Sequence, residues 1–442
     1  MSRPLSTQNR LIRDPEPAGQ RDEGVTPPYA WVIVAVLAVV MTVASGARFL
    51  FGVVLKPLSE EFGWNRAELT GAVMLAMVVI SICQPLVGIL VDRYGPKRVL
   101  VIGLSLLGVS LLPLSFATSL WQVYLLYGVL ISLGLAAASP VMATALVGRW
   151  FQAKRGLAMS LASSGSAFGQ LLIVPLAAWI LTMTSWQMTY RLQAIALLAV
   201  ALPLSALFLR DAPVARSAGH AGATAEQDGA TLREAIAHPA FWLLGFGFIV
   251  CGWTMAFPNT HFLAYADDMG MSVLHAANTV SVTAVFSIVG SVLLGLAADR
   301  YRKTWILALT YALRGIAFIF LLLLPAGNLI FVYGLVLGIS WTATTPLTAA
   351  IAADRYGAKN LGLIFGSLFT FMNLGFGLGA FLDGVIFELS GGYTAALLIN
   401  VALGLAGAVG AAVVPVTGKE RSPSRRSPVS TTEHPAPAGA AD

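Results

Sequence analysis

Four ionisable side chains lie inside apolar stretches long enough to cross a bilayer, and they are the side chains of this sequence with the clearest scope for chemistry. They are Arg48, His261, Arg314 and Asp383. A charged group at membrane depth costs about 3 kcal/mol or more unless it is solvated or paired. Each of the four therefore needs a structural or functional reason for its position.

Arg48 is the best candidate for binding an anion, because a planar guanidinium suits a carboxylate. The alternatives are that it reaches the membrane surface or pairs with a buried carboxylate. His261 follows Pro258 and Asn259 in a stretch that Gly252 and Pro258 allow to bend. A bend there exposes polar groups to a cavity, so Asn259 and His261 are predicted to bind substrate. His261 is also a candidate proton carrier, or simply an interfacial hydrogen-bonding group.

Arg314 lies near mid-depth of its apolar stretch, and we expect it to pair with an acceptor in a structural role. Asp383 is a second candidate proton carrier, or a partner for Arg48 or His261. Three uncharged side chains are costly to bury without partners and are predicted to line a substrate cavity. These are Gln170, Trp341 and Asn373.

The composition indicates that the main solvent of this chain is lipid. Of its 442 residues, 57% are hydrophobic and 11% are charged, against roughly 25% charged in a soluble domain. Mean hydropathy is +0.78. These values exclude a soluble enzyme, a nucleic-acid-binding domain and a secreted disulfide scaffold. The two cysteines, Cys83 and Cys251, lack metal-ligand spacing, so we expect packing residues, and neither a metal nor a cofactor is predicted.

The apolar runs predict an all-α integral membrane protein with twelve spans in two sets of six, since strands would show alternation and shorter runs. We expect a cytoplasmic tail over 1–28, a bundle over 29–210, a cytoplasmic linker over 211–238, a second bundle over 239–416 and a tail over 417–442. The predicted runs are Ala30–Leu55, Leu69–Val91, Val99–Ala117, Leu120–Gly148, Gly156–Met183, Leu192–Leu209, Phe241–Ala266, Val273–Ala298, Thr304–Leu324, Leu329–Ala353, Leu361–Leu389 and Tyr393–Val416.

Lysine and arginine set the expected orientation. If the N-terminus is cytoplasmic, 22 of the 27 basic residues fall in cytoplasmic segments, as the positive-inside rule requires. Both termini are then cytoplasmic, and the expected location is the plasma membrane (the inner membrane in a Gram-negative cell). The basic excess is thereby explained by orientation and lipid contact, so no nucleic-acid partner is needed.

The two halves repeat one another. At a constant offset of 206 residues, Tyr127 aligns with Tyr333 and Gly169 with Gly375, and glycine, proline and arginine matches lie between them. Two parallel six-helix repeats are the architecture of a transporter that rocks around a site at the bilayer midplane.

Two loop sequences carry a family resemblance. GILVDRYGPKRVL (Gly88–Leu100) and its echo GLAADRYRKTWIL (Gly295–Leu307) resemble the loop signature of the major facilitator superfamily. The resemblance implies the twelve-helix major facilitator fold with a central cavity. It also implies that charged residues of these loops latch the two halves together on the cytoplasmic side and so gate access. The predicted gating residues are Asp92, Arg93, Arg98, Asp299 and Arg300.

Three further stretches resemble the monocarboxylate-transporter-like branch, including its oxalate/formate antiporter-type bacterial members. They are GRWFQAKRGLAMSLASSGSAFG from Gly148, SGARFLFGVVLKPLSEEFGWNRAELT from Ser45 and GVIFELSGGY from Gly384. The animal members carry an aspartate and an arginine in their eighth helix, where this chain has Ser287 and Ser291. Their first-helix lysine is also absent, although Arg48 lies about one residue from its place. The proton-coupling residues of that branch are therefore not carried over.

The predicted function is secondary active transport of a small organic anion, a monocarboxylate by preference, through alternating access in a monomer. Proton symport stands beside it as an option. One alternative is an exporter of amphipathic drugs or metabolites, for which an acidic group such as Asp383 would serve. Another is a membrane ligand sensor, which would need a larger cytoplasmic module than the short tails offer. No phosphate-binding loop or nucleophile motif is present, so neither ATP-driven transport nor an enzyme is expected.

Overall fold

The computed structural model describes residues 28–139, 142–143, 146–147, 150–151, 155–210, 229–323, 327–357 and 360–415. The two predicted tails, except for Pro28, and most of the predicted linker lie outside these ranges. Within the ranges the chain is helical apart from turns and one isolated bridge between Gly229 and Gly357. Twelve of its helical segments are long and apolar enough to cross a membrane, so the all-α membrane fold is confirmed.

The N-terminal half contains the first six spans, three of which include a π-helical segment (η1 to η3). Its elements are α1 (Pro28–Phe62), α2 (Arg66–Tyr94), α3 (Pro96–Leu114), α4 (Leu120–Val123), η1 (Tyr124–Ile131), α5 (Ser132–Ala137), α7 (Arg155–Phe168), η2 (Gly169–Ile173), α8 (Val174–Met183), α9 (Trp186–Ala196), η3 (Leu197–Ala201) and α10 (Leu202–Phe208).

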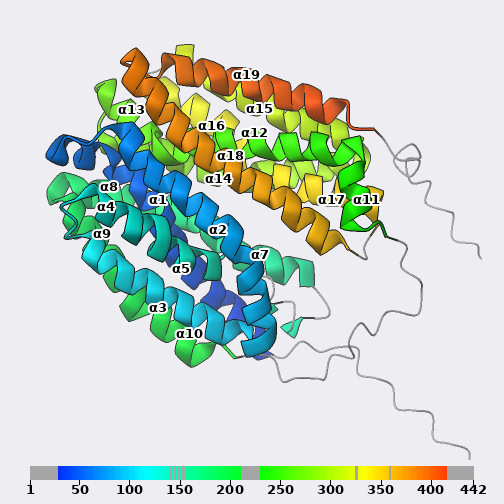
Figure 1. The fold of residues 1–442 in the computed structure, drawn as a ribbon, viewed down its shortest axis with the longest axis horizontal. Helices are drawn as coiled ribbons and strands as arrows, with labels where there is room; N and C mark the ends of the chain where they lie inside the picture. The colour runs from blue at the N-terminus through cyan, green and yellow to red at the C-terminus, as the bar shows by residue number, and fades with distance from the viewer. Residues whose placement is uncertain are drawn as a thin grey trace, which may run out of the picture.

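The C-terminal half contains the other six spans. Its elements are α11 (Leu232–Ala237), α12 (Pro239–Thr260), α13 (Phe262–Asp268), α14 (Val273–Arg300), α15 (Lys303–Leu323), the short 3-10 turn η4 (Gly327–Leu329), α16 (Ile330–Trp341), α17 (Thr344–Tyr356), α18 (Leu361–Ser390) and α19 (Thr394–Ala412). Figure 1 shows the two halves one above the other, with α1 and α2 of the first lying beside α12 and α18 of the second.

Local sequence signals explain how α2 begins and ends. Asn65 and Glu68 form a capping box at its start, and Asn65 N–H donates to the Glu68 carboxylate at 2.9 Å. Gly95 ends the helix with φ of 86°, a value that favours glycine, and Pro96 opens α3. This one-residue turn holds the Gly88–Leu100 motif at a tight helix hairpin.

The two halves meet closely at one end of the molecule. A Cβ on Gly377 of α18 would lie 3.3 Å from the Cα of Met74, and one on Gly384 would lie 3.1 Å from the Cα of Ala67, both in α2. The absence of a side chain at these positions lets α18 pack directly on α2. This contact closes the space between the halves along that part of the interface.

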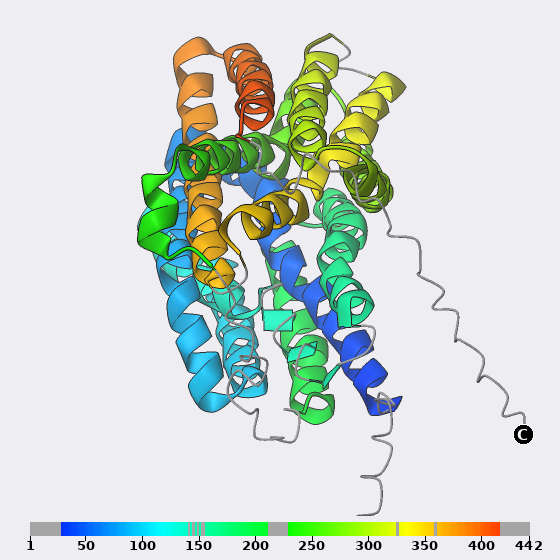
Figure 2. The same ribbon diagram turned by 90° about the vertical axis from the view of Figure 1, so that its right-hand side faces the viewer.

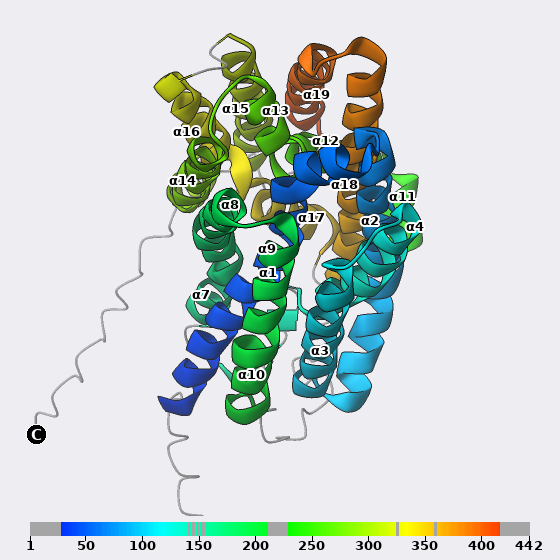
Figure 3. The ribbon, with the colours of Figure 1, turned by 90° about the vertical axis from the view of Figure 1, so that its left-hand side faces the viewer.

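The same helices separate toward the other end. Within the described part of the chain, no atom lies within 4 Å of a Cβ placed on Gly88 and Gly295, in the two repeated motifs, or on Gly362 and Gly366 at the start of α18. Figure 2 views the molecule from this side, with the N-terminal half below and the C-terminal half above, and Figure 3 views it from the opposite side, where α1 reaches toward α18. We call the end that carries Gly88 and Gly295 the open end, and the end where α18 packs on α2 the latched end.

Candidate functional site

Arg48 of α1 lies where the two halves meet. Its Nη2 is 4.0 Å from the Sδ of Met77 in α2, and its Cζ is 5.1 Å from the ring centre of Phe376 in α18. Within the described residues, no ion pair joins Arg48 to a carboxylate. The guanidinium thus rests against a thioether and an aromatic ring, one from each half, and keeps its hydrogen-bond donors for another acceptor.

Aromatic packing fixes the turn of α1 that carries Arg48. The Phe51 and Tyr127 rings lie 4.4 Å apart and inclined by 34°, and the Tyr127 hydroxyl donates to the Arg48 carbonyl at 3.5 Å. Tyr127 belongs to the π-helical segment η1, an irregularity frequent at functional sites. The backbone beneath the guanidinium is therefore held from the side of η1.

Two of the predicted cavity residues lie on the helices that pack beside this cation, near residues that contact or flank it. Asn373 precedes Phe376 by one turn of α18, and its Nδ2 is buried with no hydrogen-bond partner among the described residues. Gln170, also buried, follows Gly169, whose added Cβ would lie 3.0 Å from the Cβ of Ser45 on α1. Both residues thus belong to the neighbourhood of Arg48.

Asn259 and Trp341 have other surroundings. The Asn259 Nδ2 donates to the Met255 carbonyl at 2.6 Å, while its Oδ1 is buried without a partner among the described residues, and its backbone packs against Gly52 of α1. This places Asn259 about one turn from Arg48, toward the latched end. Trp341 ends α16 inside the C-terminal half, and its carbonyl accepts from Arg314 at 3.3 Å. The structure does not bring Trp341 to Arg48.

His261 is fully buried, and both ring nitrogens are occupied by protein groups. Nε2 is 2.8 Å from the Ala380 carbonyl and Nδ1 is 2.9 Å from the Tyr393 hydroxyl. A carbonyl can only accept, so Nε2 carries the proton and Nδ1 accepts from Tyr393. In this conformation the ring joins α12 to α18 and to the start of α19. Binding of substrate or of a transported proton by His261 stays a prediction.

The latched end is closed by four charged residues that were not among the residues predicted from the sequence. Lys56 at the end of α1 lies 2.6 Å from Asp267 and 3.0 Å from Asp268, which end α13. Arg66, the first residue of α2, lies 2.7 Å from Asp268. We call Lys56, Arg66, Asp267 and Asp268 the interhalf latch, because its bases come from the first half and its acids from the second.

Arg66 is the most buried member of the latch, with 6% of its surface exposed. Its backbone N–H donates to Glu388 and its Nη1 donates to the Tyr393 hydroxyl, both at 2.9 Å, and its guanidinium stacks 3.9 Å from the ring centre of Phe387. The hydroxyl of Tyr393 therefore joins Arg66 to His261. Burial raises the pKa of Tyr393 although Arg66 opposes it, so the hydroxyl keeps the proton it donates.

The charge of Asp268 depends on its partners. Burial by itself would raise the pKa of this carboxyl, but hydrogen bonds from Arg66 and Lys56 outweigh burial and hold the pKa below its ordinary value. Asp268 is therefore ionised at neutral pH. An acidic pair after the seventh apolar run, facing bases after the first, is the signal that could have suggested this latch from the sequence.

The predicted gating residues lie at the open end. Arg93, Arg98, Asp299 and Arg300 are all exposed, and Asp92 is in helix α2 but its side chain lies outside the described part. This conformation separates the two motifs. Their pairing in a conformation closed at this end stays a prediction.

Arg314 is fully buried in the C-terminal half, where backbone carbonyls are its main acceptors. Nη2 donates to the carbonyls of Ser340 at 2.9 Å and Trp341 at 3.3 Å, and Nη1 lies 3.3 Å from the Cys251 carbonyl and 3.1 Å from its Sγ. Helix α16 ends at Trp341, so its last carbonyls lack intrahelical donors, and a cation at a helix C-terminus is favourable. These contacts agree with the expected structural role.

Asp383 of α18 is fully buried, and neither carboxyl oxygen has a hydrogen-bond partner among the described residues. No ion pair joins it to Arg48, and the two ring nitrogens of His261 are bonded elsewhere. Its neighbour across the helix interface is Asn400 of α19.

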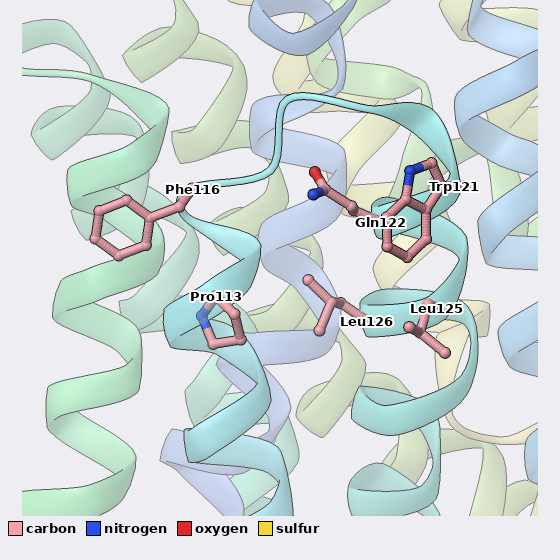
Figure 4. Close-up of a pocket in the computed structure, with 6 residues that line it drawn as sticks. All are labelled: Pro113, Phe116, Trp121, Gln122, Leu125 and Leu126. Carbon is pink, nitrogen blue, oxygen red and sulfur yellow. The ribbon is translucent and has the colours of Figure 1, made fainter.

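A groove of about 340 Å³ on the N-terminal half is lined by none of these residues (Figure 4). It is lined by residues at the end of α3 and the start of the fourth span, with no ionisable side chain among them: Pro113, Phe116, Trp121, Gln122, Leu125 and Leu126. The lining side chains themselves therefore carry no charge that could pair with a charged substrate. No cluster of potential metal ligands is found in the described part of the chain.

The sequence model of the Major Facilitator Superfamily matches residues 37–343 and, in a second match, residues 243–439. An uncharacterized MFS-type transporter of Bacillus subtilis, YcxA, is 25% identical over 384 residues, which cover 83% of this chain and 91% of that protein. Monocarboxylate transporter 13 of Rattus norvegicus is 25% identical over 86% of this chain and 87% of its own length.

Among solved structures, a bacterial homologue of the human lysosomal transporter Spinster, in an inward-facing and unoccupied conformation, superposes with a TM-score of 0.70. It is 17% identical, and the match covers 88% of this chain and 97% of that one. At this identity the similarity establishes the fold alone.

Proposed function

Since the chain belongs to the major facilitator superfamily, whose members here are secondary transporters rather than enzymes, we propose that it carries a small organic monoanion, a monocarboxylate in the first place. The observation that carries this proposal is Arg48, a cation between the two halves whose described neighbours include no carboxylate. A half-buried guanidinium in that position gains most from an anionic ligand that it can hold through paired hydrogen bonds. Asn373 and Gln170 add neutral polar groups nearby.

The arrangement of charge and apolar surface favours a monoanion. Arg314, the other arginine within the predicted apolar runs, donates from both Nη groups to protein acceptors and lies inside the C-terminal half. Arg48 is therefore the arginine that stays available to a ligand between the two halves, and its single positive charge balances one negative charge. Met77 and Phe376 beside it suit a short apolar body. The relatives named monocarboxylate transporters support this substrate class.

Alternating access follows from the two ends. The positive-inside rule makes the open end cytoplasmic, because the basic motif loops lie there, so the structure corresponds to an inward-facing state. Outward opening requires the interhalf latch to break. We propose that Asp92, Arg93, Arg98, Asp299 and Arg300 then pair across the open end and close it.

The test is uptake by proteoliposomes across a panel of short carboxylates, dicarboxylates and organic cations. Arg48→Ala should abolish uptake of the anion that the parent protein accumulates. Arg191→Ala is the matched control, since Arg191 also lies over a phenylalanine ring, Phe116 at 4.4 Å, but at the end of the N-terminal half. Unchanged uptake by Arg48→Ala, or accumulation of cations only, would overturn the proposal.

A further inference from the structure

We propose that Asp383 is a proton-binding site and that the proton it holds is required for the latched end to close. This inference deepens the proposed function by naming the coupling ion and its site. It concerns a carboxyl outside the Arg48 site, and its first test needs no substrate.

The surroundings of Asp383 fit the neutral acid. The side chain is fully buried at membrane depth, and neither oxygen has a hydrogen-bond partner among the described residues. No basic side chain pairs with it in that part of the chain. An isolated carboxylate pays a large desolvation cost in such a place, whereas the protonated acid pays little.

Asn400 supplies an acceptor for that proton. Its Nδ2 donates to the Ala396 carbonyl at 2.9 Å, and its Oδ1 is a buried acceptor without a partner among the described residues. The carboxyl of Asp383 and the amide of Asn400 are neighbours between α18 and α19. The amide can turn either a second N–H group or its oxygen toward the carboxyl, and a proton on Asp383 gives the unpartnered oxygen a donor.

Asp383 also lies on the turn of α18 that closes the latched end. The next residue, Gly384, packs on α2 so closely that a Cβ there would lie 2.7 Å from the Thr70 hydroxyl. One turn earlier, the Ala380 carbonyl accepts from His261. One turn later, the Phe387 ring stacks against the Arg66 guanidinium. We infer that movement of α2 away from this turn of α18 is the step that admits water to Asp383, because the side chain is fully buried in the present conformation.

The charged and titratable groups around this turn come from four elements. They are Arg66 of α2, His261 after α12, Asp268 of α13 and Tyr393 before α19, and Glu388 of α18 itself accepts from the Arg66 backbone N–H. Arg66 is shared between Asp268 and Tyr393. An ionised Asp383 would add a second carboxylate that competes with Asp268 for the Arg66 guanidinium. Its negative charge would also favour a positively charged imidazole at His261.

Protonation removes this competition. A hydronium ion at the latched end transfers a proton to a carboxylate oxygen of Asp383 and becomes water, so one O–H bond is broken and one is made. Arg66 then stays with Asp268, the latch closes, and α2 covers the neutral acid. Proton binding and closure therefore favour one another, as linkage requires.

The test measures opening directly. Thr70 is fully buried between α2 and α18, so the thiol introduced by Thr70→Cys reacts with a water-soluble reagent only when the latched end opens. Thr118→Cys, on an exposed loop, reports the intrinsic pH dependence of thiol reactivity. Both variants are labelled in lipid nanodiscs across a pH series and quantified on the relevant peptide by mass spectrometry, so Cys83 and Cys251 remain in place.

We expect the ratio of labelling in Thr70→Cys to labelling in Thr118→Cys to rise several-fold from acidic to alkaline pH. With Asp383→Asn, a neutral mimic, the ratio should stay low and flat, and Asp383→Glu should restore the rise. A pH response retained by Asp383→Asn, or none in the parent, overturns the inference. Infrared difference spectra provide a second readout: the C=O band of a protonated carboxyl should be present in the parent and missing in Asp383→Asn.

The transport proposal and the proton-site proposal can be refuted independently of one another. Anion uptake that depends on Arg48, together with a flat labelling ratio, would leave the transport proposal standing and refute the proton site. A pH-dependent ratio that requires Asp383, in a protein that moves no anion, would do the reverse.

Discussion

Removal of one charge from the interhalf latch should shift the protein toward conformations that are open at the latched end. The substitution is Asp268→Asn, which keeps the shape of the side chain but removes the negative charge that both Lys56 and Arg66 contact, at 3.0 and 2.7 Å. Asp267 remains as a partner for Lys56 alone. The variant therefore leaves Arg66 without its acidic partner.

The magnitude follows from the geometry. Two unit charges 2.7 Å apart attract by roughly 6 kcal/mol at an effective dielectric constant of about 20. Desolvation offsets much of this attraction, and solvent screens the pair because Asp268 is 26% exposed. A net loss of about 1–3 kcal/mol remains, equivalent to a shift of roughly 5- to 150-fold in the equilibrium between the two arrangements.

The assay is a distance distribution between spin labels at Thr118 of the N-terminal half and Thr394 of the C-terminal half, both exposed near the latched end. We expect Asp268→Asn to move population to longer distances. The matched control is Glu60→Gln: Glu60 also contacts Lys56, at 3.8 Å, but within α1, so its loss breaks no contact between the halves. Identical distributions for Asp268→Asn and the parent, or an equal shift in Glu60→Gln, would refute the assignment of the latch.

Three further predictions follow from other contacts. The pKa of Asp268 is lowered, so the stabilisation from its ionised form is fully present above the ordinary carboxyl value and is lost as pH falls through the lowered pKa. The spin-label distance should therefore show a separate lengthening step at strongly acidic pH, and Asp268→Asn should show no such step. Gly384→Ala should wedge α2 away from α18 and lengthen the same distance, whereas Gly362→Ala, with open space around it, should not, and equal effects would contradict the packing argument. Phe376→Ala removes the ring beside Arg48 and should raise the KM of the transported anion by about 2- to 30-fold, for about 0.5–2 kcal/mol, while Phe116→Ala, under Arg191, leaves KM unchanged in the same uptake assay.

Apolar patterning locates the spans well, because lipid contact imposes it residue by residue. It does not locate helix ends. The first run predicts an end at Leu55, but α1 continues to Phe62, about two turns further. Those turns are polar because they leave the bilayer, and they carry Lys56 into the latch. Hydropathy therefore reports where lipid ends rather than where the helix ends.

Breaks inside spans are only partly predictable. The seventh span does break at His261, three residues after Pro258, as expected. Gly252, which is expected to help the bend, instead lies inside α12 and packs against the Met372 carbonyl of α18. The tenth span is expected to be continuous, but it is interrupted at Thr342 and Ala343, between α16 and α17. Arg314 binds the carbonyls freed there, an arrangement that depends on a contact between three helices.

The candidate site is likewise only partly predictable from the sequence. The cost of a charge in lipid is local, so the sequence could point to Arg48, Arg314 and Asp383 as residues that need an explanation. The partners are not local. His261 owes its bonds to Ala380 and Tyr393, more than a hundred residues away in the sequence, and Asp268 owes its charge to Arg66. No single-sequence pattern contains those distances.

Helix α18 connects the anion site to the latch. It runs unbroken from Leu361 to Ser390 without a proline. Spacings of three and four residues put one set of its side chains on a single face: Asn373, Phe376, Ala380, Asp383 and Phe387. The first two belong to the Arg48 neighbourhood, and the last stacks on Arg66 about 16 Å further along the axis. Because a ligand shifts a conformational equilibrium only through differential contacts, an anion that draws Arg48 away from Phe376 changes a contact between the halves. A rigid α18 would pass that change to Asp383 and the latch, so substrate and proton would act on the same moving element.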